Sequence, residues 1–144
     1  MQRVIAVVCC AVLCSCGGGS GGAAPPPGPA TTETRTFTGT THANSATSCG
    51  GDSHDFEARE GTVAVTLVQS TDGTALSLQV CAGGIDNNDC TINQSRIAVG
   101  QTISGARKGV AQQNLKLLPL NCSPAGGPVP AGPIAYTASV SFQR

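Results

Sequence analysis

Three segments of this chain alternate apolar and polar residues with a period of two, which is typical of β-strands that bury one face. They are residues 62–69, 74–81 and 136–143. In the last of these, Tyr136, Ala138, Val140 and Phe142 alternate with small polar residues. A chain built from such segments must pair them into a sheet and then cover the apolar face with a second layer.

Turn residues separate these segments from weaker strand candidates. Asp72-Gly73 lies between residues 62–69 and 74–81, and this pair predicts that the two strands form a hairpin. The weaker candidates are residues 34–40, 54–58, 95–99, 101–104 and 114–119. No segment of ten or more residues shows convincing helical periodicity. We therefore expect an all-β fold, an antiparallel β-sandwich or jelly roll of about seven to eight short strands.

The first residues have the features of an export signal. A short basic start with Arg3 precedes the apolar run Val4 to Leu13, which is too short to span a membrane. Leu13-Cys14-Ser15-Cys16 then resembles the lipobox of bacterial lipoproteins, with Leu at −3, a small residue at −1 and Cys at +1. The boundaries that follow are a signal peptide at 1–15, a tether at 16–33 and one domain at 34–144. An ordinary secretory leader is the alternative.

The lipobox resemblance implies that Cys16 carries the acyl groups and that the membrane is a partner through them. Several acyl chains are needed for stable anchoring, because a single chain binds only marginally. The glycines of 17–22 and the prolines of 25–29 are typical of an unfolded spacer. We expect a lipid-anchored location in the bacterial cell envelope, at the outer membrane in a Gram-negative cell, with the domain facing the periplasm or the exterior.

Four cysteines remain after cleavage and lipidation, namely Cys49, Cys81, Cys90 and Cys122. An even number in an exported domain predicts two disulfides, for which three connectivities exist. Cys81 and Cys90 flank a loop rich in Gly, Asn and Asp, which favours their pairing and leaves Cys49 with Cys122. A zinc site is the rival interpretation, but the close Cys-x-x-Cys pairs of such sites are absent.

One further resemblance covers residues 34 to 143. The segment Asp55 to Leu67, the strand Leu76 to Cys81 and the ending Ala135 to Val140 are similar to bacterial pre-peptidase C-terminal (PPC-like) β-sandwich domains. This resemblance implies a β-sandwich that accompanies secreted enzymes or stands alone at the surface and is not itself catalytic. The acidic element of that family is replaced here by Asp72-Gly73-Thr74-Ala75, so the calcium role of relatives is not carried over.

Two groups of residues carry side chains that could take part in catalysis or metal binding. His54 lies near Asp52 and Asp55 and could act as a base or a metal ligand, and His42 is in the same polar region. The run Asp86 to Asp89 offers oxygen ligands for Ca²⁺ but lacks the spacing of an EF-hand. Nucleophile-elbow, zinc-protease and phosphate-loop motifs are absent. We assign no catalytic residue, no metal ligand and no cofactor, and we expect no enzymatic activity.

Charge and aromatic content narrow the class of partner. The formal net charge is zero, so the basic surface that nucleic acid requires is missing. Three Phe, one Tyr and no Trp leave few aromatic platforms for stacking sugars. We expect a non-catalytic binding or interaction role, with an unknown protein or polysaccharide as the ligand. The alternative is a carbohydrate-binding or enzyme-accessory module, and a third interpretation is a small metal-binding protein or hydrolase.

Overall fold

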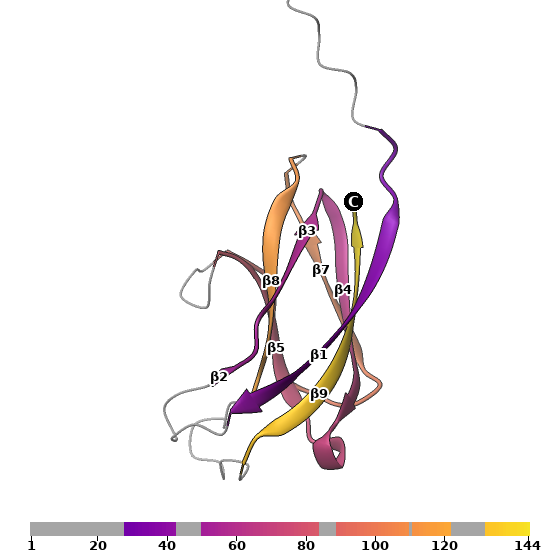
Figure 1. Ribbon diagram of the computed structural model, residues 1–144. Helices are drawn as coiled ribbons and strands as arrows, with labels where there is room; N and C mark the ends of the chain where they lie inside the picture. Colours follow the sequence, from indigo (N-terminus) through magenta and orange to yellow (C-terminus); the bar gives the residue numbers. More distant parts are fainter. Residues whose placement is uncertain (1–27, 43–49, 84–88, 110, 122–131) are drawn as a thin grey trace, which may run out of the picture.

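Two antiparallel sheets pack face to face in the computed structural model of the chain (Figure 1). The structure describes residues 28–42, 50–83, 89–109, 111–121 and 132–144. Cys16, Cys49 and Cys122 lie outside these ranges, as do the leader and most of the predicted tether. No helix in the described ranges is long and apolar enough to cross a membrane.

Within these described ranges, nine strands form the two sheets. Sheet A has the order β2 (Gly50–Gly51), β1 (Thr32–His42), β9 (Ile134–Gln143), β4 (Gly61–Ser70) and β7 (Thr102–Arg107). Sheet B has the order β3 (His54–Ala58), β8 (Gln113–Leu120), β5 (Leu76–Ala82) and β6 (Cys90–Ile97). A single 3₁₀ turn, η1 (Thr71–Gly73), connects β4 with β5.

The strand pairs are nested around the centre of the chain. Strand β5 pairs with β6, β4 with β7, β3 with β8 and β1 with β9, all antiparallel. The chain is therefore one long hairpin that is folded over into two sheets, which is the jelly-roll arrangement. The predicted fold class is confirmed, and the count exceeds the predicted seven to eight because β2 contributes a ninth strand of only two residues.

The core lies between the sheets and consists mainly of aliphatic side chains from alternating positions. Sheet A contributes Val63, Val65 and Leu67 from β4 and Val140 from β9. Sheet B contributes mainly Leu76, Leu78, Val80, Leu115 and Leu117. Each of these side chains is almost fully buried, and burying one stabilises the fold by about 1.5–3 kcal/mol relative to leaving it exposed.

The predicted hairpin of residues 62–69 and 74–81 is wrong. Strands β4 and β5 belong to different sheets, and η1 carries the chain from one sheet to the other. In η1, Asp72 and Gly73 both have positive φ, as they would in a tight turn. The two strands face each other across the core, because each has an apolar face that only a second layer can bury.

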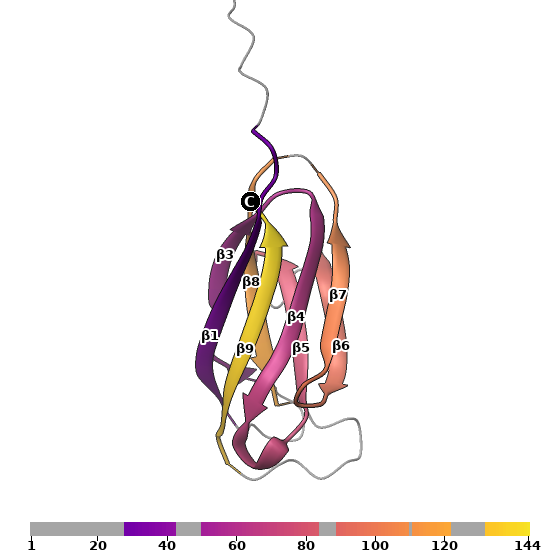
Figure 2. The same cartoon turned by 90° about the vertical axis from the view of Figure 1, so that its right-hand side faces the viewer.

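The two ends of the sandwich differ in what they carry. At the end that we call the entry end, the backbones of Thr31 and Arg144 exchange two hydrogen bonds of 2.9 and 3.3 Å. The β3–β4 and β7–β8 connections lie at this end, where the chain from residue 28 joins β1 (Figures 1 and 2). The opposite end, which we call the far end, carries η1, His42 and the β6–β7 turn.

Strands β1, β9, β4 and β7 lie in front in Figure 2. Small uncharged residues are in register across these four strands on the outer face of sheet A. One row consists of Thr36, Ser139, Thr66 and Thr102, and the next of Thr34, Ser141, Ala64 and Ser104. The Thr66 and Thr102 hydroxyls are hydrogen-bonded at 2.7 Å. We call this surface the hydroxyl face.

Candidate functional site

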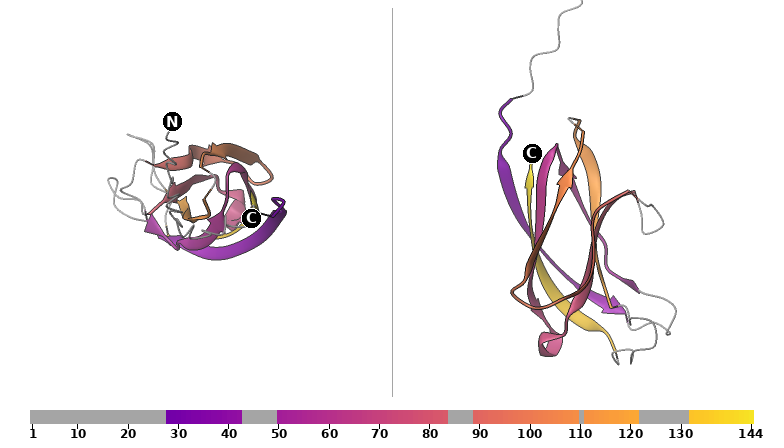
Figure 3. Two further views of the ribbon diagram at one scale, coloured as in Figure 1. Left: turned by 90° about the horizontal axis from the view of Figure 1, so that it is seen from above. Right: turned by 180° about the vertical axis from the view of Figure 1, so that it is seen from behind.

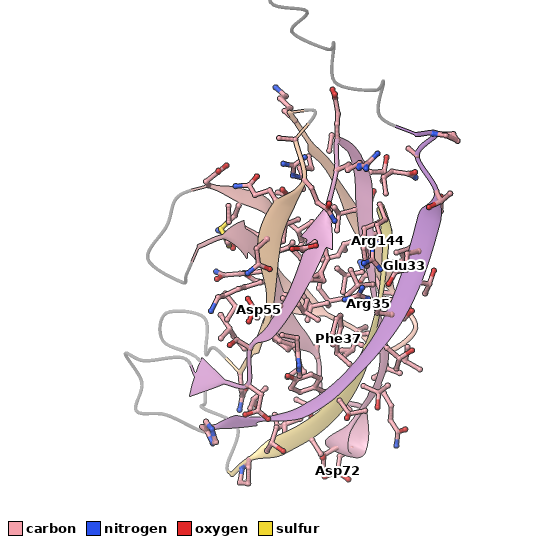
Figure 4. All side chains as sticks on the ribbon, turned by 45° about the horizontal axis from the view of Figure 1, so that its top comes forward. Glu33, Arg35, Phe37, Asp55, Asp72 and Arg144 are labelled. Carbon is pink, nitrogen blue, oxygen red and sulfur yellow. A yellow bond between two sulfur atoms is a disulfide. The ribbon has the colours of Figure 1, made fainter. Side chains whose placement is uncertain are left out.

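All four aromatic residues of the chain gather with His54 between β1, β3 and β9. The Phe37 ring stacks on the His54 imidazole, with centroids 4.9 Å apart and an interplanar angle of 21°. Phe56 lies 6.3 Å from Phe37 and 4.8 Å from Phe142. Because Phe37 comes from sheet A and His54 from sheet B, this stack closes the side of the sandwich where β1 and β3 lie (Figure 4).

A chain of hydrogen bonds links His54 to Tyr136 and Asp52. The His54 Nε2 and the Tyr136 hydroxyl are 2.8 Å apart, and that hydroxyl donates to the Asp52 carbonyl oxygen at 3.2 Å. Because the hydroxyl hydrogen is used in this way, the hydroxyl oxygen accepts a hydrogen bond from the N–H at His54 Nε2. The Asp52 carboxylate has a different partner, since its Oδ2 accepts from the Thr40 N–H at 2.8 Å.

Gly39 makes room for this arrangement. It is paired with Tyr136 in the β1–β9 ladder, and a Cβ atom at Gly39 would lie 2.6 Å from the Tyr136 hydroxyl oxygen and 2.9 Å from Asp52 Oδ2. The Tyr136 ring therefore lies across the bare backbone of β1, with only 3% of the residue exposed. A glycine inside a strand often marks such a close approach.

Burial sets the protonation of both ring groups. Burial lowers the pKa of His54 below its usual value, and the charges of Asp52 and Asp55 oppose this shift. Burial, assisted by Asp52, raises the pKa of the Tyr136 hydroxyl well above its usual value. At neutral pH both rings are thus uncharged, and the Tyr136 hydroxyl is a poor base and a poor nucleophile.

Asp55 does not join this group, although it follows His54 directly. Successive residues of a strand point to opposite faces, and the Asp55 carboxylate accepts from Asn114 at 3.2 Å and lies 3.8 Å from the Lys116 ammonium. His42 is exposed at the end of β1 and pairs in the ladder with Gly50. Among the residues that the structure describes, no group of three His, Cys, Asp or Glu side chains could hold a metal ion.

The predicted Cys81–Cys90 disulfide is present and links the end of β5 to the start of β6. Next to it, the Ala82 N–H donates to the Asp89 carbonyl oxygen at 3.0 Å. Of the suggested calcium-binding run, Asp86 to Asn88 lie outside the described residues. Asp89 therefore lies next to the disulfide, and its carbonyl oxygen is engaged in the hydrogen bond from Ala82.

A shallow cavity at the far end is a feature that the sequence did not predict. Its volume is about 150 Å³. It is lined by Gln69, Thr71, Ala135, Tyr136 and Thr137. Beside it Val68, which is 48% exposed, is the extra residue of a β-bulge between Leu67 and Gln69. The alternation of β4 breaks here, since apolar Val68 directly follows apolar Leu67, but this break alone does not identify a bulge.

Comparisons with known proteins leave the chain unassigned. No protein-family model matches it, and no curated protein matches it either.

The position of His54 predicts a pH dependence of stability. Because its pKa is lowered in the folded state, the unfolded chain binds a proton first as the pH falls below about 6.5. The contribution of neutral His54 to stability is complete above that pH and decreases as the pH falls toward the folded-state pKa. Urea unfolding at a series of pH values from about 7.5 to 5, with disulfides intact, measures this loss.

His54→Gln should reduce the loss of stability between about pH 7.5 and 5. His42→Gln replaces the exposed histidine and should leave this loss unchanged. Equal pH dependence of the free energy of unfolding in the wild type and in His54→Gln would contradict the assignment.

Proposed function

We propose that the chain is a non-catalytic, lipid-anchored binding module of the bacterial cell envelope, with a domain of the PPC-like kind. In this proposal Cys16 carries the acyl groups, residues 16–33 form the tether, and the sandwich presents a ligand-binding surface. The observation that carries the proposal is the difference between the two ends of the sandwich, because the segment that precedes β1 joins the domain at only one of them.

The entry end is fastened to the segment before β1 by several contacts. Besides the two backbone hydrogen bonds between Thr31 and Arg144, Arg59 Nη1 donates to the Gly28 carbonyl oxygen at 3.4 Å. The Glu33 carboxylate forms ion pairs with both Arg35 and Arg144 at this end (Figure 4). A membrane anchor upstream of residue 28 would therefore hold the entry end toward the membrane and leave the far end available to a partner.

The far end has features suited to a binding surface. Val68 and Val99, the exposed large hydrophobics of the described residues, are 48% and 40% exposed. The β6–β7 turn that carries Val99 is bound to β4 next to Val68, since the Gly100 N–H donates to the Leu67 carbonyl at 2.7 Å. Exposed apolar side chains beside a polar hollow are typical of interaction sites. We place the binding surface here.

The second disulfide of the proposal joins Cys49 to Cys122. Cys49 directly precedes β2, and Cys122 directly follows Asn121. Strand β2 lies against the end of β8, where a Cβ atom on Gly51 would lie 2.4 Å from the Pro119 carbonyl oxygen. Cys49 is two residues from Gly51 and Cys122 is three residues from Pro119. One residue spans at most about 3.6 Å, so these short segments allow the proposed bond.

Carbohydrate binding is the second candidate, and the hydroxyl face favours it. Stacking on aromatic rings is not available, because Phe56, Tyr136 and Phe142 are buried and Phe37 is half-buried against His54. The hydroxyl face instead offers rows of uncharged donors and acceptors, spaced by about 4.8 Å between strands. A neutral polysaccharide lying across these strands would meet no charged side chain in the two rows.

The anchor predicts the mass of the mature protein. Protein purified from its native membrane fraction should have a mass that begins at Cys16 and includes acyl groups. Cys16→Ser removes the thiol that accepts the diacylglyceryl group, so the acyl mass and the membrane association should both be lost. A wild-type protein without acyl groups would contradict the proposed lipid anchor, because Cys16 is the only residue proposed to carry them.

The second disulfide predicts one cross-linked peptide pair. A digest of the unreduced, alkylated protein should contain a peptide that joins Cys49 to Cys122, and reduction should separate its halves. Replacing both cysteines by Ser should lower the free energy of unfolding by about 2–5 kcal/mol. Free Cys49 and Cys122 thiols in the oxidised, denatured protein would show that the bond is absent.

Carbohydrate binding predicts retention on insoluble neutral polysaccharides. Lysines placed on the hydroxyl face in the Thr34→Lys, Ser104→Lys double variant should abolish retention, because they add two charges to a surface without any. The matched control is Gln94→Lys with Ser95→Lys on β6, where both residues are exposed. Equal retention of the two double variants would exclude this face as the binding surface.

A further inference from the structure

Arg107, the last residue of β7, is a buried cation at the entry end. Only 6% of it is exposed. Its Nη1 donates to the Gly109 carbonyl at 2.6 Å, and its Nη2 donates to the Ala111 carbonyl at 2.7 Å and to Gln113 Oε1 at 3.1 Å. These bonds fasten the β7–β8 connection. They leave the guanidinium bonded only to neutral acceptors.

Among the residues that the structure describes, no carboxylate forms an ion pair with the Arg107 guanidinium. The ion pairs within the described ranges join Glu33 to Arg35 and Arg144, and Asp55 to Lys116, and none of them includes Arg107. In addition, the Arg107 Nε is buried and has no hydrogen-bond partner. A buried charge is normally paired, because its separation from water is costly. A buried and unpaired guanidinium is therefore a site that an anion would stabilise.

A cavity adjoins this guanidinium between the two sheets. Its volume is about 150 Å³, roughly the space of five water molecules in the liquid. Arg107, Lys108 and Gln113 line one part of it, and Ala82 and Leu115 provide apolar walls. Cys90 and Asp89 also line the cavity, so the Cys81–Cys90 disulfide fixes that part of its wall.

The charges around the cavity define the ligand. Arg107 and Lys108 are positive and Asp89 is negative, which leaves one positive charge. Asp89 forms no ion pair with either cation, so it does not neutralise the guanidinium directly. One added negative charge would balance the site, and a carboxylate carries one charge in a compact planar group.

We propose that this cavity binds a carboxylate group of a ligand, with Arg107 as the buried counter-charge and Lys108 as a second, exposed cation. The carboxylate belongs to a peptide, because the apolar Ala82 and Leu115 suit its neighbouring carbon atoms better than the hydroxyl groups of a sugar ring. This proposal does not depend on the lipid anchor, nor on binding at the far end.

The experiment uses the ¹⁵N-labelled full-length chain with its disulfides formed. Acetate is titrated into the protein, and sodium chloride is titrated at the same ionic strength as the control. The side-chain Nε–H signal of Arg107 should shift saturably with acetate and not with chloride. Glucuronate and N-acetylglycine are then compared, and N-acetylglycine should bind more tightly. Tighter binding of glucuronate would overturn the assignment to a peptide.

Two variants near the cavity should change the acetate affinity in opposite directions. Lys108→Gln removes an attracting charge and should weaken binding by about two- to fivefold, and Asp89→Asn removes a repelling charge and should strengthen it by a similar factor. Lys116→Gln, which removes the same charge from β8 outside the cavity, should leave the affinity unchanged. Lys108 and Asp89 are exposed, so these substitutions are compatible with folding.

Three results would overturn the proposal. They are an Arg107 signal that responds equally to chloride and acetate, a response that never saturates, and equal affinities for Lys108→Gln and Asp89→Asn. Tighter binding of dimethyl phosphate than of acetate would overturn the carboxylate assignment.

Discussion

The packing of two aliphatic sheet faces against each other is the constraint on which the rest of this structure depends. Sheet A contributes Val63, Val65 and Leu67 to the core, and sheet B contributes Leu76, Leu78 and Val80. The two sheets lie face to face as two layers (Figure 3). The nested strand pairs follow from this packing, since each half of a folded hairpin must turn its apolar face toward the other half.

The sequence predicted which residues form strands, and it failed to predict how some strands are connected. Alternation located β4, β5 and β9 closely, because period two reports directly which face is buried. It did not distinguish a hairpin from a crossing between sheets. Asp72-Gly73 serves equally well in both, and the strand that pairs with β4 is β7, which lies far along the chain. Local turn chemistry therefore misled the prediction.

The candidate sites were likewise predicted only in part from the sequence. His54 stood out in the sequence, but its partner is the Tyr136 hydroxyl from a strand 82 residues away, and only Gly39 inside β1 hinted at that approach. Arg107 was overlooked because charged residues are normally expected outside. Its position contradicts that expectation, since Ile103, Gly105 and Arg107 occupy alternate positions of β7 and share the inward face. A charged residue at a position that the alternation turns toward the core was therefore the signal in the sequence that could have identified Arg107.

The same inward position explains how a cation can be buried at Arg107 at all. Gly105 brings β7 against β6 so closely that a Cβ atom there would lie 2.0 Å from the Thr91 carbonyl oxygen. The sandwich is thus narrow at Gly105, and the inward position two residues later, at the entry end, is filled by a long side chain that reaches the carbonyls of the β7–β8 connection. An apolar residue at that position could not bond those carbonyls. Arg107 therefore orders the connection while its charge has no carboxylate partner among the described residues, and a ligand carboxylate would supply one.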